Sequence, residues 1–376
     1  MTNSMDLRPF RIEIPDADVA DLRARVAATR WPAQLTDTGW ERGVPVGYLK
    51  ELAEYWRDGF DWRAGEAELN AHPQFVTTVD GQDLHFLHVR SANEDATPLL
   101  LLHGWPGSVV EFLDLIPLLT DEFHLVVPSL PGYGFSGSVT AAGWTDGRSA
   151  SALVELMDRL RYDRYGVQGG DVGGFLGPEI GRLAPDRVVG VHANAFVTFP
   201  SDDPSDLAGL TEDEQRRLAL FQQFQEDGSG YLRLQGTRPQ TLAYGLTDSP
   251  VAQLAWIVEK FQEWSDPAAE LPEDAVDRDR LLTDVSIYWF TGTAASTAHS
   301  YYERLHDAAF WAPRERFTVP TAVANFATDI AIRRFAERDH TIVRWTTFDR
   351  GGHFAAMEAP DLLAADVRGF FADLTH

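Results

Sequence analysis

Short runs of uninterrupted apolar residues recur along the chain and constrain its fold more than any other feature. The first run is 99–102, four leucines in a row, and further runs lie at 125–127, 165–167, 188–191, 322–324 and, interrupted by Arg344, 342–345. A strand that is apolar at every position is buried on both faces, which is typical of a parallel sheet. Helical patterns separate several of these runs, as at 150–160. Strands that alternate with helices predict an α/β fold with a mostly parallel central sheet.

The segment before this sheet has a different pattern. In the region 1–72, apolar residues recur at helical spacing after Pro15, and we expect that helix to end at Pro32 and a second helix to cover 46–60. From residue 75 the period changes to two, and strands at 75–79 and 84–89 flank Asp80-Gly81-Gln82, which predicts a hairpin.

A long stretch without strand signals interrupts the α/β pattern. Helical periods appear there at 212–225 and 251–264. We therefore expect a helical insertion between two strands of the sheet. The predicted division of the chain is an N-terminal helical wrap region, a first part of the α/β core, a helical cap and a second part of the core, at 1–72, 73–197, 198–313 and 314–376.

The charge balance excludes several classes of protein. The 376 residues include 32 basic and 57 acidic ones, so the net charge is −25. Such a chain repels phosphates and anionic lipids, so we expect neither nucleic acid nor a membrane as partner. No run approaches the roughly 18 apolar residues of a membrane span, and the first nine residues, with Asp6 and Arg8, do not resemble a signal peptide. We expect a cytoplasmic protein. The chain has no cysteine, which excludes disulfides and thiolate chemistry.

The strongest local signal for chemistry is Gly169-Gly170-Asp171-Val172-Gly173-Gly174. It follows a predicted strand and opens a helix. Small residues on both sides of one reactive residue are what a sharp strand-to-helix turn requires, as in the nucleophile elbow G-x-S-x-G. This pattern predicts that Asp171 is a nucleophile in place of serine. A glycine-rich turn with an Asp that caps the helix remains the alternative.

His103-Gly104-Trp105-Pro106 follows the four leucines directly. Hydrolases with a nucleophile elbow place one oxyanion donor after this strand. We expect the backbone N–H groups of Trp105 and Val172 to face a developing negative charge. His103, with Gly104 and Pro106, is expected to have a structural role.

A glycine-flanked histidine follows the last predicted strand, in Arg350-Gly351-Gly352-His353-Phe354. This position suits a general base. Asp329 follows the strand at 322–324, where an orienting acid belongs. The order Asp171, Asp329, His353 along the chain matches nucleophile, acid and base.

Together these motifs resemble the microsomal-type epoxide hydrolases, which have an α/β-hydrolase fold with an N-terminal helical region. The resemblance covers nearly the whole chain. It rests on Phe10-Arg11-Ile12, Pro15-Asp16, Thr29-Arg30-Trp31-Pro32, His103-Gly104-Trp105-Pro106, Pro131-Gly132-Tyr133-Gly134-Phe135-Ser136, Gly169-Gly170-Asp171, Asp248-Ser249-Pro250, Tyr288-Trp289-Phe290-Thr291-Gly292-Thr293, Tyr301 and Arg350-Gly351-Gly352-His353-Phe354.

The resemblance implies a reaction and further site residues. Asp171 opens an epoxide, two cap tyrosines hold the epoxide oxygen, and water activated by His353 releases a vicinal diol. The local match assigns the tyrosines to Tyr301 and Tyr231, with Tyr302 as the rival of Tyr301. The partners are then a small epoxide and water, with no metal or organic cofactor.

The chain departs from its relatives at two positions. Many members have Trp where this chain has Val172, and the mammalian members have Glu in place of Asp329. In haloalkane dehalogenases, which share the fold and the Asp nucleophile, a Trp after the nucleophile helps to hold halide. A dehalogenase-like hydrolase and a non-catalytic ligand-binding protein remain alternatives.

The substrate is open at this stage. We expect some aromatic residues of the insertion to lie in the core at helical spacing, and others could line an apolar pocket, which suits aryl or alkyl epoxides. These residues include Phe221, Phe224, Trp256, Phe261 and Trp264. Related bacterial enzymes act in detoxification or in natural-product pathways, including those of enediyne antibiotics, and the sequence does not choose between these roles. A homodimer also stays open.

Overall fold

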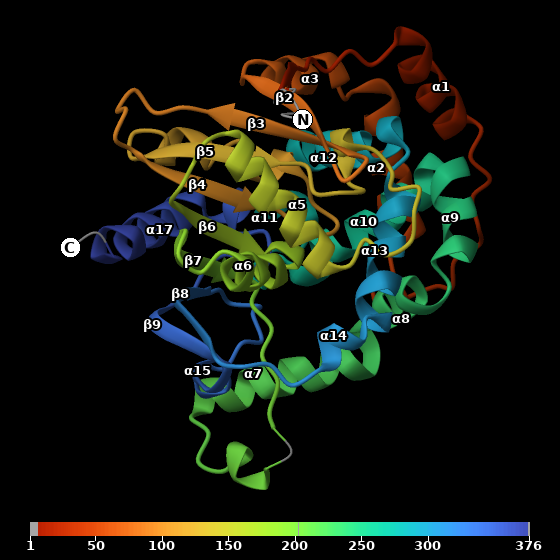
Figure 1. The fold of residues 1–376 in the computed structure, drawn as a ribbon. Coiled ribbons are helices and arrows are strands. Elements are labelled where there is room, and N and C mark those ends of the chain that lie inside the picture. The colour runs from red at the N-terminus through yellow and green to blue at the C-terminus, as the bar shows by residue number, and fades with distance from the viewer. Residues whose placement is uncertain (1–6, 202, 375–376) are drawn as a thin grey trace.

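A computed structural model of the protein describes residues 7–201 and 203–374. Met1 to Asp6, where we expect no signal peptide, lie outside the described residues. The described strands form one nine-stranded sheet in the order β1-β2-β3-β5-β4-β6-β7-β8-β9 (Figure 1). The strands are β1 (Arg8–Pro9), β2 (Gln74–Val79), β3 (Gln82–Val89), β4 (Thr97–Leu102), β5 (Phe123–Pro128), β6 (Tyr165–Gly170), β7 (Val188–Asn194), β8 (Phe317–Asn325) and β9 (His340–Thr347).

The sheet is mostly parallel, which confirms the predicted fold class. β5, β4, β6, β7, β8 and β9 pair in parallel, whereas β1, β2, β3 and β5 pair antiparallel. The predicted hairpin joins β2 and β3, and its turn residues Asp80 and Gly81 both have positive φ, at 52° and 80°. Two such residues are typical of the tight turn that matches the twist of a hairpin.

Helices cover both faces of the sheet at β6 and β7. Side chains alternate between the two faces of a strand, so the contacts of two neighbouring residues show which helices cover each face of the sheet. A Cβ on Gly190 of β7 would meet Phe370, whereas Gly177 of α6 (Val172–Leu183) packs against Val191 of β7. One face is therefore covered by α6, together with α5 (Asp146–Arg159). The other is covered by α17 (Pro360–Leu374), which also contacts α4 (Ile116–Leu119).

All described elements between β7 and β8 are helical, as expected for the insertion. We call this segment the cap. It contains η3 (Pro204–Leu207), α7 (Glu212–Gln223), η4 (Phe224–Gly228), α8 (Gly230–Thr237), α9 (Pro239–Asp248), α10 (Pro250–Trp264), α11 (Pro272–Ala275), α12 (Arg278–Thr291), α13 (Ala294–His306) and α14 (Ala308–Trp311). The remaining helices are η1 (Val109–Phe112), η2 (Gly134–Ser136), α15 (Arg333–Asp339) and α16 (Ala355–Glu358).

The N-terminal helices lie beside the cap (Figure 1). They are α1 (Asp16–Ala27), α2 (Val46–Asp58) and α3 (Trp62–Asn70). α1 and α2 contact α10, and α3 contacts α12. The expected end of α1 at Pro32 is wrong, because the helix already ends at Ala27. The sequence patterns also missed α3 and the two-residue edge strand β1.

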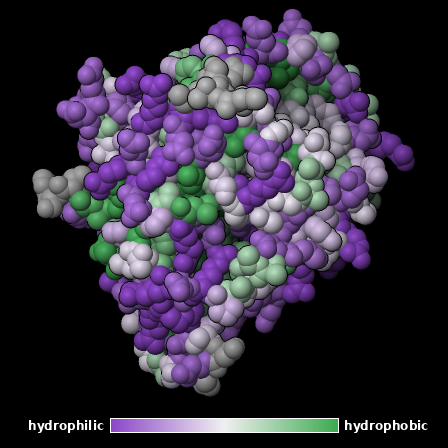
Figure 2. All heavy atoms as spheres, in the orientation of Figure 1, coloured by the Kyte–Doolittle hydropathy of each residue, from purple (hydrophilic) through white to green (hydrophobic). Residues whose placement is uncertain are grey.

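The visible surface is mostly hydrophilic (Figure 2). Hydrophilic residues cover most of the face seen in Figure 2, and hydrophobic residues appear there in small patches. Among the described helices, none is long and apolar enough to cross a membrane.

Candidate active site

Asp171 occupies a sharp turn between β6 and α6. Its backbone has φ 53° and ψ −115°, which is rare for a residue with a side chain. The turn requires close backbone packing, since a Cβ on Gly173 would lie 2.2 Å from the carbonyl oxygen of Leu102. Glycine avoids this clash. The resulting turn has the form of a nucleophile elbow and leaves the Asp171 carboxylate partly exposed, at 20%.

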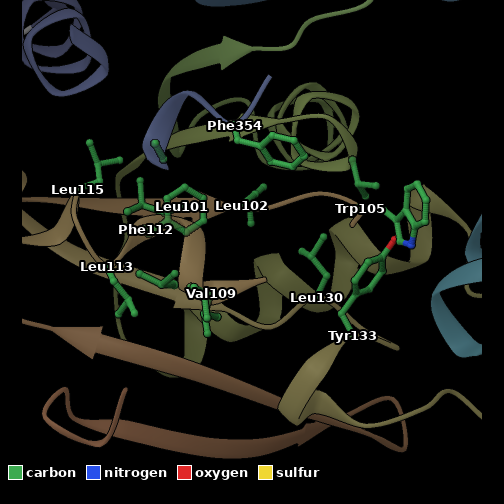
Figure 3. Packing of buried hydrophobic residues seen from close by; sticks show 14 of the residues in the cluster. Leu101, Leu102, Trp105, Val109, Phe112, Leu113, Leu115, Leu130, Tyr133 and Phe354 are labelled. Atoms are coloured by element: carbon green, nitrogen blue, oxygen red, sulfur yellow. The ribbon is translucent and has the colours of Figure 1, made fainter. Parts of the chain in front are cut away.

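The segment after β4 lies against this carboxylate. The backbone N–H of Trp105 donates a hydrogen bond to Asp171 Oδ1 at 2.9 Å. Val172 is the first residue of α6, where backbone N–H groups have no partner within the helix. Figure 3 shows the apolar packing around the end of β4, with side chains of Leu101, Leu102, Trp105, Val109, Phe112, Leu130, Tyr133 and Phe354.

His103 supports this segment from inside the core. Its ring is buried, with Nδ1 3.0 Å from the carbonyl oxygen of Gly104, and the N–H of Leu130 donates to Nε2 at 3.1 Å. Burial lowers the pKa of His103 to about 4. A neutral imidazole with both nitrogens engaged agrees with the structural role expected from the sequence.

His353 faces the carboxylate from the opposite side. Its Nε2 lies 3.6 Å from Asp171 Oδ2. The loop that carries it is tied to the cap, because the His353 N–H donates to the carbonyl oxygen of Trp264 at 2.9 Å. Glu358 accepts from the N–H groups of Phe354 and Asp266 at 2.9 and 2.7 Å.

Asp329 is buried in the loop after β8. One of its oxygens, Oδ2, accepts from the N–H of Phe326 at 2.8 Å and from the N–H of Ala195 at 3.4 Å. Burial raises the pKa of Asp329, and the Phe326 N–H and the charge of His353 act against that rise. The side chain of His353 is therefore close enough to Asp329 for its charge to act on the Asp329 carboxyl group.

The cap supplies two buried phenols from α8 and α13. Tyr231 and Tyr301 are 8% and 4% exposed, and their ring centroids lie 5.9 Å apart. Burial, followed by the charge of Asp171, raises the pKa of both phenols well above 10. Tyr302, the rival of Tyr301, is 37% exposed and stacks on His306 at 3.9 Å. Of the two neighbours, only Tyr301 reaches the site.

Aromatic rings join the cap tyrosines to the core. The Trp105 indole stacks on Tyr231 at 5.1 Å and meets Tyr301 edge-on at 5.9 Å. Trp264, at the end of α10, lies 5.2 Å from the Tyr231 ring and 4.8 Å from that of His353. Helical periodicity marks Trp264 only as one aromatic residue of the insertion, so its contact with the histidine was not predicted.

Two substrate-sized cavities lie around the elbow. One of about 370 Å³ runs past Asp171 and is lined with aromatic side chains, among them Phe175, Phe196, Phe310 and Trp311. The other, of about 300 Å³, lies on the side of Val172 and is lined in part by Tyr133, His299 and Arg304. In the described part of the chain, no group of three or more His, Asp and Glu side chains could hold a metal ion.

Most of the cap aromatics named from the sequence lie elsewhere. None of Phe221, Phe224, Trp256, Phe261 and Trp264 lines either of these two cavities. Phe261 is instead buried in the core, where it stacks on Phe354 at 4.0 Å. Phe261 is thus one of the residues expected in the core, whereas the expectation that others line an apolar pocket is not met in these two cavities. The aromatic rings of the larger cavity include those of Phe175, Phe196 and Phe310.

Comparisons with known proteins agree with this arrangement. The model of the epoxide hydrolase N terminus matches residues 7–112, and that of the alpha/beta hydrolase fold matches residues 97–227. A protein of Stigmatella aurantiaca is 45% identical over 98% of this chain and 85% of its own length. Epoxide hydrolase 1 of Sus scrofa is 34% identical over 97% of this chain and 88% of its own length.

A solved structure is similar over almost the whole fold. The epoxide hydrolase of Aspergillus niger has a TM-score of 0.89 at 32% identity, over 99% of this chain and 97% of its own. The identities and coverage extend through the N-terminal region, the sheet and the cap. The chain therefore belongs to the microsomal-type epoxide hydrolases, enzymes that hydrolyse an ether bond and combine this N-terminal region with an α/β-hydrolase fold.

Proposed function

We propose that the protein converts an apolar aryl or alkyl epoxide to a vicinal diol through an ester formed on Asp171. One observation carries the proposal. The Asp171 carboxylate stands at a strained turn, 3.6 Å from the imidazole of His353, and the charge of this carboxylate acts on two buried cap phenols. A nucleophile, a base and two acids are what a covalent epoxide opening requires.

In the first step, the Asp171 carboxylate attacks an epoxide carbon. Aspartate is ionised at neutral pH and needs no base. The C–O bond of the ring breaks, and its oxygen takes a proton from Tyr231 or Tyr301. Their raised pKa values keep both phenols protonated until the ring oxygen gains charge. The product of this step is a hydroxyalkyl ester of Asp171.

In the second step, water attacks the ester carbonyl carbon. His353, whose cation would be stabilised by Asp329, takes a proton from this water. The carbonyl electrons move to the oxygen that faces the N–H groups of Trp105 and Val172. When the carbonyl re-forms, the bond to the diol oxygen breaks and His353 returns its proton to that oxygen. Asp171 then loses its proton, which restores the tyrosine.

The cavity beside Asp171 supports an apolar substrate. Aromatic side chains of Phe175, Phe196, Phe310 and Trp311 line it, and rings of this kind suit aryl and alkyl groups. Roles in detoxification, aromatic hydrocarbon catabolism or antibiotic biosynthesis, a cytoplasmic location and a homodimer stay predictions from the sequence. Membership of the epoxide hydrolase family argues against the dehalogenase and ligand-binding alternatives.

A trapped intermediate tests the proposal. The variant His353→Gln removes the base of the second step and leaves the nucleophile intact. With styrene oxide, we expect the protein mass to rise by the mass of the epoxide and the adduct to map to Asp171. Asp171→Ala in the same background is the control and should remain unmodified. A His353→Gln enzyme that is unmodified and still active would contradict the covalent mechanism.

A further inference from the structure

A second, much smaller cavity lies beside Asp171 and His353. The volume in which the centre of a water molecule fits is about 10 Å³, so the cavity has room for about one water. Four polar side chains line it, those of Glu111, Asp171, Asn194 and His353, and Phe112 and Phe354 form apolar walls. Polar partners on several sides are what a single bound water needs.

Glu111 is the one ionisable side chain of these four that the proposed reaction does not use. It lies in η1, and its carboxyl group packs directly over Gly107, where any Cβ would clash with Oε1. The backbone N–H of Gly104 acts on the same carboxyl group and opposes the rise of its pKa. On its other side, Gly104 packs against Asp171, since a Cβ there would lie 2.4 Å from Asp171 Oδ1. The two carboxyl groups therefore flank one glycine.

The surroundings of Glu111 favour the neutral form of its carboxyl group. Burial raises its pKa well above 4.5, and the nearby Asp284 and Asp171 raise it further. A neutral carboxyl group does not repel the nucleophile. It also offers both a hydrogen-bond acceptor, its carbonyl oxygen, and a donor, its O–H.

Asn194 closes the cavity in a fixed orientation. Its Oδ1 accepts from Gln168 Nε2 at 2.8 Å, and its Nδ2 lies 3.5 Å from the carbonyl oxygen of His353. The imidazole of His353 is not closely paired with Asp171, since Nε2 and Oδ2 are 3.6 Å apart. A water in the cavity can therefore reach the base and the carboxyl carbon of Asp171 at the same time.

We infer that this cavity holds the water that hydrolyses the Asp171 ester, and that Glu111 is its positioning residue. The inference rests on the proposed function. One hydrogen of the water points to His353 Nε2 and the other to the carbonyl oxygen of Glu111. The water oxygen then bonds to the ester carbon as its proton moves to His353. Glu111 itself gains and loses no proton in this step.

Single-turnover kinetics of Glu111 variants test the inference. Glu111→Gln keeps the carbonyl acceptor and the shape of the side chain, whereas Glu111→Leu removes every polar atom. With excess enzyme and styrene oxide, rapid quenching and mass spectrometry measure how fast the Asp171 ester forms and decays. We expect ester decay to slow by about 10- to 100-fold in Glu111→Leu, because one hydrogen bond to the reacting water is lost. The effect in Glu111→Gln should be smaller. Ester formation should change by less than about threefold, because the water takes no part in it.

The matched control is Glu66→Gln. Glu66 is a buried glutamate, held by the N–H of Ile14 at 2.8 Å and by Arg63 at 2.7 Å, and it does not line the cavity. Both rates should stay at the wild-type values in this variant. If Glu111→Leu does not fold, Glu111→Met, which also lacks the carboxyl group, takes its place.

Two outcomes would overturn the inference and leave the proposed function intact. In one, ester decay in Glu111→Leu equals that of wild type. In the other, formation and decay fall together, which means that Glu111 only supports the oxyanion segment. His353→Gln is run in parallel, and a failure to form any adduct there removes the ester itself and with it both proposals.

Discussion

The substitution Gly173→Ala tests whether the nucleophile elbow depends on close backbone packing. A Cβ at Gly173 would lie 2.2 Å from the carbonyl oxygen of Leu102 and 2.8 Å from its carbonyl carbon. Atoms in contact prefer separations of about 3.5 Å, so the two backbones must separate by about 1 Å. This shift changes the distance between Asp171, at the start of α6, and the segment after β4 that carries Trp105.

The size of the effect follows from two opposing contributions. Overpacking of a well-packed site costs typically 1–3 kcal/mol, and a contact with a backbone carbonyl favours the upper end of that range. Replacement of a helical glycine by alanine returns up to about 1 kcal/mol. We therefore expect the free energy of unfolding to fall by about 2 kcal/mol. A displacement of about 1 Å in the reacting groups is expected to lower kcat/KM about 100-fold.

The neighbouring glycine provides the control. A Cβ at Gly174 would meet only ordinary contacts, the nearest being the carbonyl oxygen of Asn194 at 3.7 Å. Urea unfolding should show that Gly174→Ala is as stable as wild type or more stable by up to about 1 kcal/mol. If Gly173→Ala is equally stable and opens styrene oxide at the wild-type rate, the close packing of the elbow is not required and this reasoning is wrong.

Two further predictions concern the cap and the core. Tyr301→Phe should slow ester formation by about 10- to 100-fold, because one hydrogen bond to the developing alkoxide is lost; Tyr302→Phe, on the exposed neighbour, should leave that rate unchanged, and equal effects would refute the assignment. Burial tends to raise the pKa of Asp366, but hydrogen bonds from His192, Thr346 and Arg344 outweigh it and lower the pKa to about 2. A depressed folded-state pKa stabilises the protein above the unfolded value of about 4 and loses this effect as the pH falls toward 2. Asp366→Asn should therefore lower the free energy of unfolding by about 2–3 kcal/mol at pH 7, with a difference that closes between about pH 4 and pH 2; a difference that does not change with pH would contradict this.

The centre of the sheet could be predicted because strands such as β4 and β5 are buried on both faces. The four leucines at 99–102 carry that information within four residues, and all of them are fully buried in β4. The elbow could be predicted for a related reason, since only small residues on both sides of Asp171 allow its turn. By contrast, β1 has two residues and no period, and it is ordered by pairing with β2, which local sequence does not show.

The cap was harder to predict in detail. Helical periodicity shows which residues share a face, but not whether that face meets the core or a cavity. Phe261 and Trp264 both belong to α10, yet Phe261 packs in the core and Trp264 contacts His353. Glu111 was missed because its place depends on the turn at Gly107. The available signal was an acidic residue, one of two with Asp114, in the apolar stretch that follows His103.

Oxygen labelling in one turnover tests the covalent route most directly. Excess enzyme opens one equivalent of styrene oxide in water enriched in ¹⁸O, and mass spectrometry reads the diol and the peptide that contains Asp171. Since the oxygen added to the epoxide comes from the carboxylate, we expect the first diol to contain no ¹⁸O and the label to appear in Asp171. A first diol that carries ¹⁸O, with Asp171 unlabelled, would show direct attack by water and contradict the ester on Asp171.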